Sequence, residues 1–182
     1  MRKRTSFRVA LSGILAALMT VVMLLGTLIP GTTYLCPALA GVFLIPVLWE
    51  LGVRTGGLVF AAVSLLSLFL APDKQAALFF VLLFGWYPLL RPRLQRIRQL
   101  AVRWVVKFLL FNLALVAIAL VTVFVLGLPL FGPEEKGGTM LVLVGMLVLG
   151  NVAFVLYDIL LGRLSDLYVL RLRPKLFPKG SL

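Results

Sequence analysis

Residues Val9–Trp49 read VALSGILAALMTVVMLLGTLIPGTTYLCPALAGVFLIPVLW and contain no Lys, Arg, Asp or Glu. A helix that crosses the ~30 Å hydrocarbon core of a bilayer needs roughly 20 residues, so this stretch is long enough for two crossings. Pro30-Gly31 and Pro37 interrupt it, because proline lacks a backbone donor and glycine favours a turn. The stretch therefore predicts two membrane-spanning helices joined by a short turn.

Four further stretches without charged residues extend this pattern. They cover residues 55–72, 75–90, 108–133 and 137–157. The sequence therefore predicts an all-α polytopic membrane protein with six transmembrane helices in one domain, residues 1–182. The expected spans lie near residues 7–29, 35–49, 56–71, 75–90, 104–128 and 139–161. The composition agrees, because a soluble chain of 182 residues that is 62% hydrophobic and 13% charged could not bury so much apolar surface.

The basic residues occupy alternate gaps between the predicted spans. Of the 18 Lys and Arg residues, all but Lys74 and Lys136 lie at the N-terminus, in the second gap, in the fourth gap or in the C-terminal tail. Because cytoplasmic loops carry an excess of Lys and Arg, both termini are expected in the cytoplasm and the protein in the cell membrane. The net charge of +12 thus follows the topology. We expect anionic lipids of the bilayer to be its partner, and no nucleic acid.

Residue types that carry most catalytic chemistry are missing or scattered. The chain has no His, and its single Cys is Cys36. The lack of His removes the commonest general base and metal ligand. The six acidic residues are dispersed, and no G-x-x-x-x-G-K-S/T phosphate loop occurs. The sequence therefore argues against an enzyme, a metal centre and a cofactor, and favours a protein that binds a small molecule or another protein.

Two asparagines lie within the last two predicted spans. Asn112 follows Lys107 by five residues and Asn151 precedes Asp158 by seven, so antiparallel helices would place both amides at similar depth. One interpretation is a hydrogen bond between the two amides across the helices. The other is a polar floor under a substrate cavity, with Asn151 binding substrate and Asp158 neutralised by Lys107 or Arg103.

The first predicted helix carries two rows of small residues at four-residue spacing. Ser12 and Ala16 form one row, which Thr20 continues, and Gly13 and Ala17 form the other. This spacing lets a second helix backbone approach closely. The rows lie 100° apart around the helix, and either could pack inside the bundle or against a partner.

The basic segment after Pro92 also carries a helical pattern. Its apolar residues repeat at three- and four-residue steps, and its Arg residues occupy other positions. This pattern predicts an amphipathic helix, starting near Leu94, that lies on the inner leaflet and binds lipid headgroups or a cytoplasmic partner.

The run Arg8–Leu18 has the form R-x-A-L-x-G-I-L-A-A-L, follows a basic N-terminus and precedes the Pro30-Gly31 break. With six predicted helices, these features resemble the substrate-binding S component of energy-coupling factor (ECF) transporters. The resemblance implies a protein that binds a small molecule from outside and works with a transmembrane coupling subunit and ATPases. It also implies that one small-residue row, Ser12/Ala16 or Gly13/Ala17, contacts the coupling subunit.

The resemblance further implies that the loop between the first two helices helps close the substrate pocket. The candidate contacts at this outer rim are Thr33, Tyr34, Asp73, Lys74 and Gln75. By residue type alone they could equally be solvated turn residues, with Asp73 capping the next helix. The six-helix layout also occurs in a cell-shape scaffold of rod-shaped bacteria, so the alternative function is a non-transport scaffold or interaction protein of the cell envelope.

Overall fold

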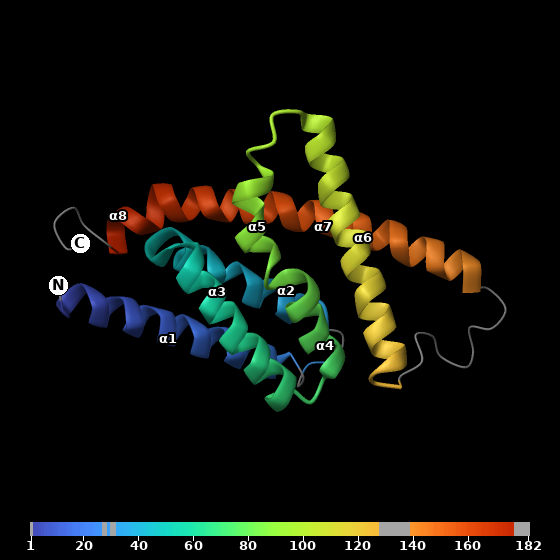
Figure 1. Ribbon diagram of the computed structural model, residues 1–182, viewed down its shortest axis with the longest axis horizontal. Helices are drawn as coiled ribbons and strands as arrows, with labels where there is room; N and C mark the ends of the chain where they lie inside the picture. The colour runs from blue at the N-terminus through green and yellow to red at the C-terminus, as the bar shows by residue number, and fades with distance from the viewer. Residues whose placement is uncertain (1, 27–28, 30–31, 128–138, 177–182) are drawn as a thin grey trace. The chain divides into compact units, whose positions relative to one another are not determined.

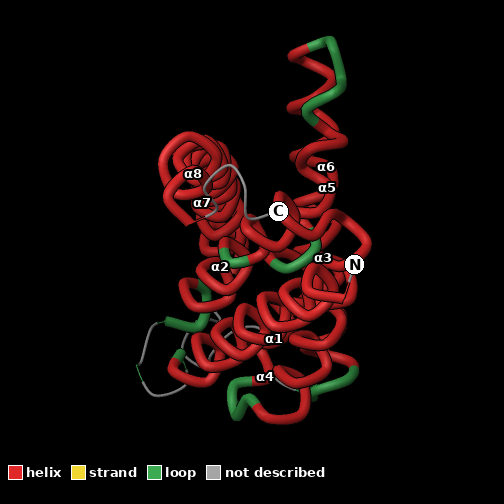
Figure 2. Tube along the Cα trace, turned by 90° about the vertical axis from the view of Figure 1, so that its left-hand side faces the viewer, coloured by secondary structure: helices red, strands yellow, loops and turns green. Residues whose placement is uncertain are grey.

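The computed structural model describes residues 2–26, 29, 32–127 and 139–176 (Figure 1). Pro30-Gly31 and Lys136, both used in the sequence predictions, lie outside the described residues. Helices account for nearly all of what is described, and no strand occurs there (Figure 2). The all-α class is therefore confirmed.

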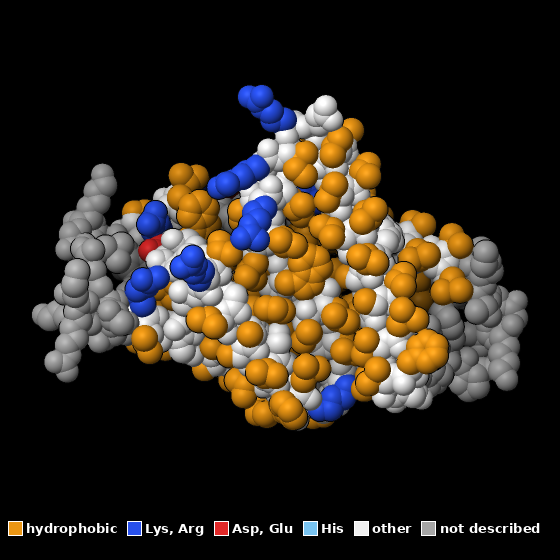
Figure 3. Space-filling view, viewed as in Figure 1, with side chains coloured by type: hydrophobic (Ala, Val, Ile, Leu, Met, Phe, Trp, Pro, Cys, Tyr) orange, Lys and Arg blue, Asp and Glu red, His pale blue; other side chains and the backbone are white. Residues whose placement is uncertain are grey.

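Five helical runs in the described part of the chain are long and apolar enough to cross a membrane. Large hydrophobic side chains are exposed along these runs, and they cover much of the face seen in Figure 3. Such a surface suits lipid contact. The helices are thus compatible with a multi-pass membrane protein. The runs are Arg8–Leu25, Leu44–Leu70, Lys74–Leu94, Leu100–Phe124 and Leu143–Leu172.

The chain divides into two compact units, residues 1–92 with 160–182, and residues 93–159. In the first unit, α1 (Arg2–Leu25) packs against α2 (Leu35–Val42) and α3 (Leu44–Leu70). Close packing of this kind is what holds helices together in lipid, where water exclusion contributes little. The single domain expected over residues 1–182 stays a prediction. The core of the first unit contains Met19, Met23, Ala40, Leu44, Val47, Leu51, Val59, Val63 and Phe80.

A sharp turn divides α3 at Gly52, whose φ of 84° and ψ of 172° belong to a region that only glycine adopts without strain. Leu48 precedes the turn and Gly56 follows it. A Cβ built on Gly56 would lie 2.7 Å from Leu48 Cδ2. In a straight helix these positions would be ~12 Å apart along the axis, so the two arms of α3 fold toward each other.

The second predicted span, residues 35–49, corresponds to α2 plus the arm of α3 before Gly52. The arm after Gly52 corresponds to the third predicted span, residues 56–71. The helix is interrupted within this span, because α2 ends at Val42 and α3 begins at Leu44. Pro46 supplies the physical reason, since it lacks the N–H that would bond to the Val42 carbonyl in a continuous helix.

The fourth predicted span is built from three consecutive pieces, α4 (Lys74–Phe79), a π-helical turn η1 (Phe80–Phe84) and α5 (Tyr87–Leu94). The Gly85 N–H donates to the carbonyl of the first η1 residue at 2.7 Å, which closes the wider turn. Pro88 follows, and its missing N–H prevents an α-helical bond back to the last η1 residue.

The last predicted spans correspond to α6 (Leu100–Phe124) and α7 (Thr139–Leu167), which η3 (Tyr168–Leu172) and the short α8 (Arg173–Leu176) continue. The amphipathic helix expected from Leu94 is wrong in its position. Residues 95–99 are not helical, and helix resumes only at residue 100. Arg93 and Arg96 lie three residues apart, and like charges at this spacing disfavour a helix.

Candidate functional site

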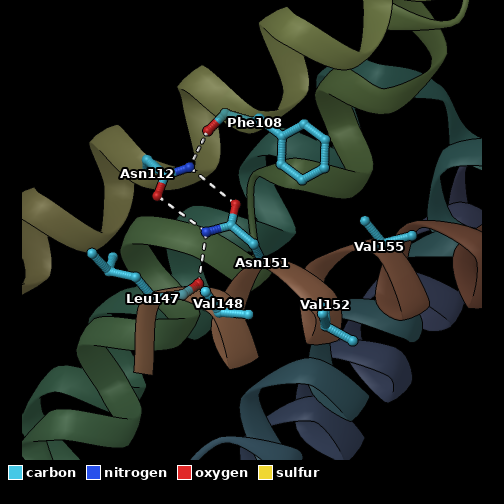
Figure 4. A pocket seen from close by; sticks show the side chains of 7 residues that line it. All are labelled: Phe108, Asn112, Leu147, Val148, Asn151, Val152 and Val155. Carbon is cyan, nitrogen blue, oxygen red and sulfur yellow. Dashed lines mark hydrogen bonds between the residues drawn. The ribbon is translucent and has the colours of Figure 1, made fainter. Parts of the chain in front are cut away.

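An open hollow of about 500 Å³ lies between α6 and α7, within the second unit (Figure 4). Its volume falls in the range of pockets that hold small molecules. Five apolar side chains and two asparagines line it, so its polar character comes from the two amides. The lining residues are Phe108, Asn112, Leu147, Val148, Asn151, Val152 and Val155.

The two asparagines bond to each other across the helices. Asn112 Nδ2 donates to Asn151 Oδ1 at 3.1 Å, and Asn151 Nδ2 donates to Asn112 Oδ1 at 3.3 Å. Each amide also donates to the carbonyl four residues earlier, that of Phe108 at 2.8 Å and that of Leu147 at 2.7 Å. The predicted bond between Asn112 and Asn151 is therefore confirmed.

Aromatic packing holds the helices close enough for these bonds. Phe111 of α6 stacks on Phe154 of α7, with ring centroids 4.5 Å apart and an interplanar angle of 19°. Gly150 lies beside this stack, where a Cβ would be 3.6 Å from the Phe111 ring. A small residue next to a large ring lets the backbones approach, and this brings the amides within reach of each other.

A buried ion pair forms a second polar link between α6 and α7. Lys107 Nζ lies 2.5 Å from Asp158 Oδ2, and the two side chains are 2% and 6% exposed. The Lys107 ammonium also lies 4.8 Å from the centroid of the Trp104 ring. A buried carboxylate such as that of Asp158 needs a charged partner. Lys107 is one of the two partners that the sequence suggested, and Arg103 was the other.

The outer-rim candidates are brought together, and their polar groups take structural roles. Thr33 Oγ1 donates to Asp73 Oδ2 at 2.9 Å, and Asp73 Oδ1 accepts the Ala76 N–H at 3.0 Å. Asp73 is thus the N-cap of α4, which is one of the two roles that the sequence allowed it, and it ties the segment before α2 to that helix. Lys74 Nζ donates to the Leu68 carbonyl near the end of α3 at 2.8 Å.

The aromatic rim candidate packs against the same region. Tyr34 meets Phe79 of α4 edge to face, with centroids 4.8 Å apart. Gln75 lies on the first turn of α4 and is half-buried. Contact of these rim residues with substrate stays a prediction.

The two small-residue rows of α1 differ in their burial. Ala16 packs against the core of the first unit, and the next member of that row, Thr20, is buried and donates to the Ala16 carbonyl at 2.9 Å. Gly13 and Ala17 are exposed, and a Cβ on Gly13 would meet nothing within 4 Å. Ser12, half-buried, completes the packed row.

One polar cluster that the sequence reasoning missed lies beside the Gly52 turn inside α3. The Glu50 side chain, 3% exposed, accepts from Arg173 Nε at 2.9 Å and from the Tyr168 hydroxyl at 3.4 Å. Arg8 donates to the Leu51 carbonyl at 2.9 Å. The sequence could have indicated this cluster, because Glu50 is an acidic residue at the end of a long uncharged stretch and the C-terminal tail of the chain is basic.

Comparison with known proteins finds no matching family model, curated protein or solved structure. In the part of the chain that the structure describes, no group of three or more His, Cys, Asp or Glu residues could hold a metal ion.

Proposed function

We propose that the chain is the substrate-capture component of an ECF-type importer, working with a transmembrane coupling subunit and ATPases. One observation carries this proposal. Gly13 and Ala17 form an exposed row on α1, whereas Ala16 and Thr20 pack inside the first unit. The family resemblance assigns such a row to the coupling contact, and small residues on an exposed face let a partner helix approach closely.

The hollow between α6 and α7 supports the capture role. An apolar lining with a few convergent polar groups is typical of small-molecule sites. The sharp turn at Gly52 supports six membrane crossings, because it gives the long α3 two arms, one on each side of the turn. The distribution of Lys and Arg supports a location in the cell membrane with both termini in the cytoplasm.

The proposed topology predicts opposite labelling at two exposed positions. On a Cys36→Ser background, Pro72→Cys is expected to react with a membrane-impermeant maleimide in intact cells. Arg96→Cys is expected to react only after permeabilisation, because it lies in the Arg-rich cytoplasmic gap. Strong labelling at position 96 in intact cells would show that the topology is wrong.

The coupling proposal predicts different losses at two neighbouring alanines. Ala17→Leu is expected to leave thermal stability unchanged and to reduce recovery of the coupling subunit and ATPases at least tenfold, because it blocks close helix contact. Ala16→Leu is expected to destabilise the chain by about 1–3 kcal/mol through overpacking. The measurements are the melting temperature of each purified variant and mass spectrometry of proteins that co-purify from native membranes. Unchanged recovery with Ala17→Leu would contradict the proposal.

A non-transport scaffold of the cell envelope is the second candidate function. It is favoured by the rim, where the Asp73 carboxylate and the Lys74 ammonium already cap helix ends. The hollow distinguishes the two functions, since a scaffold needs no bound small molecule. A ligand retained in the hollow of the purified protein would favour capture.

A further inference from the structure

We propose that the hollow between α6 and α7 binds an uncharged, mostly apolar alcohol, whose hydroxyl donates to the asparagine oxygens. This deepens the proposed function by naming the substrate class, and it rests on that function for calling the molecule a substrate. Asn112 and Asn151 lie side by side at the hollow, as Figure 4 shows, and their hydrogen bonds determine what a ligand can offer there.

All amide donors of the two asparagines are already used. An asparagine amide carries two N–H groups, and here each donates once across the helices and once to a helix carbonyl. The carbonyls of Phe108 and Leu147 receive these bonds. A ligand group that must accept a hydrogen bond therefore finds no free side-chain donor in the lining.

Acceptor capacity remains in the hollow. A carbonyl oxygen accepts two hydrogen bonds, and the Oδ1 atoms of Asn112 and Asn151 each accept one from the opposite amide. Each oxygen therefore has one lone pair left. A hydroxyl entering the hollow can donate to either oxygen, and this is the polar interaction that the lining offers.

A charged ligand is disfavoured for two reasons, the apolar lining and the lack of a free counter-ion. The other five lining side chains are Phe, Leu and Val, and an ion placed against them loses hydration without gaining a partner. Lys107, the nearest cation along α6, is already paired with Asp158. Carboxylates and phosphates thus lack both donors and a counter-ion, and an ammonium lacks a carboxylate.

The spare acceptors also argue against an ordinary acyl chain as the intended occupant. A hydrocarbon tail fills the apolar lining but leaves both oxygens unmatched, and the ester groups of lipids are acceptors. An alcohol fills the same lining and adds one hydrogen bond. A net gain of one such bond corresponds to about three- to tenfold in affinity.

Three photoactivatable diazirine probes test this inference on the purified full-length chain in phosphatidylcholine nanodiscs. They share one twelve-carbon chain and end in a hydroxyl, a methyl ether or a carboxylate. Crosslinks are mapped by mass spectrometry to residues 147–155 of α7. We expect the alcohol to label this segment about three- to tenfold more than the ether or the carboxylate, and excess 1-dodecanol to compete.

Matched variants separate the site from general lipid contact. Val148→Trp is expected to fill the hollow and abolish labelling, whereas Val144→Trp, which is exposed on the same helix but outside the lining, is expected to keep it. The double change Asn112→Leu with Asn151→Leu is expected to remove the preference for alcohol over ether. If that variant does not fold, the two Val variants still decide.

Equal labelling by alcohol and ether, stronger labelling by the carboxylate, or identical behaviour of the two Val variants would each overturn the inference. The assay contains no coupling subunit. A negative result in this assay therefore does not affect the Ala17→Leu prediction. A failure of the Ala17→Leu prediction likewise does not affect the inference of alcohol binding.

Discussion

Asp158→Ala is expected to destabilise the protein by roughly 3–5 kcal/mol, the largest loss predicted for a single side chain here. The reason is Lys107, whose side chain is 2% exposed and whose Nζ lies 2.5 Å from Asp158 Oδ2. Removing the carboxylate leaves a buried cation without its counter-ion in a low-dielectric region. The free energy of unfolding in detergent, from chemical denaturation of the purified protein, measures the effect.

Two controls identify the ion pair as the cause. Asp166→Ala removes an exposed carboxylate from the same helix and is expected to change stability by less than about 0.5 kcal/mol. Lys107→Met combined with Asp158→Leu is expected to lose far less than Asp158→Ala, because replacing a whole buried pair with apolar residues is often neutral. A double variant as unstable as the single one would refute this explanation.

Gly52→Ala is expected to lower the free energy of unfolding by about 1–3 kcal/mol. A side chain is strained at φ 84° and ψ 172°, and relieving that strain would move the arms of α3 that contribute Val47 and Val59 to the core. The measurement is the same denaturation experiment, supplemented by the melting temperature.

Gly57→Ala is the matched control. Gly57 lies in the helical arm of α3, where a Cβ would make an ordinary 3.8 Å contact with Leu89. Alanine favours a helix over glycine by up to ~1 kcal/mol, so this change is expected to be neutral or stabilising. Equal losses at positions 52 and 57 would mean that the turn does not depend on the glycine conformation.

The ion pair and the amide pair together fix the register of α6 against α7. Asn112 lies ~7.5 Å along α6 from Lys107, and Asn151 lies ~10.5 Å along α7 from Asp158. Two links between different pairs of residues restrain how α6 slides and turns where it crosses α7. Loss of Asp158 is therefore expected to disturb the hollow as well as stability, which would appear as reduced alcohol labelling in the surviving folded protein.

Much of the polar framework could be predicted from the sequence. A polar group inside an apolar span must find a partner, and few partners were available at matching depth. This reasoning predicted the bond between Asn112 and Asn151, and it reduced the partner of Asp158 to two candidates. For Asp73, local turn chemistry offered the N-cap role as one of two alternatives. The helical class followed from the length and apolar character of the uncharged stretches.

The tertiary structure decided which faces are covered. Along α1, Ala16 and Ala17 are equally small and apolar, yet one packs in the core and the other is exposed. A soluble helix would reveal its buried face by its hydrophobic periodicity. In a membrane helix the lipid-facing side is as apolar as the packed side, so the pattern carries no such contrast. Likewise Gly52 and Gly57 are alike in the sequence, and only the packing of Leu48 against Gly56 shows which glycine makes the turn.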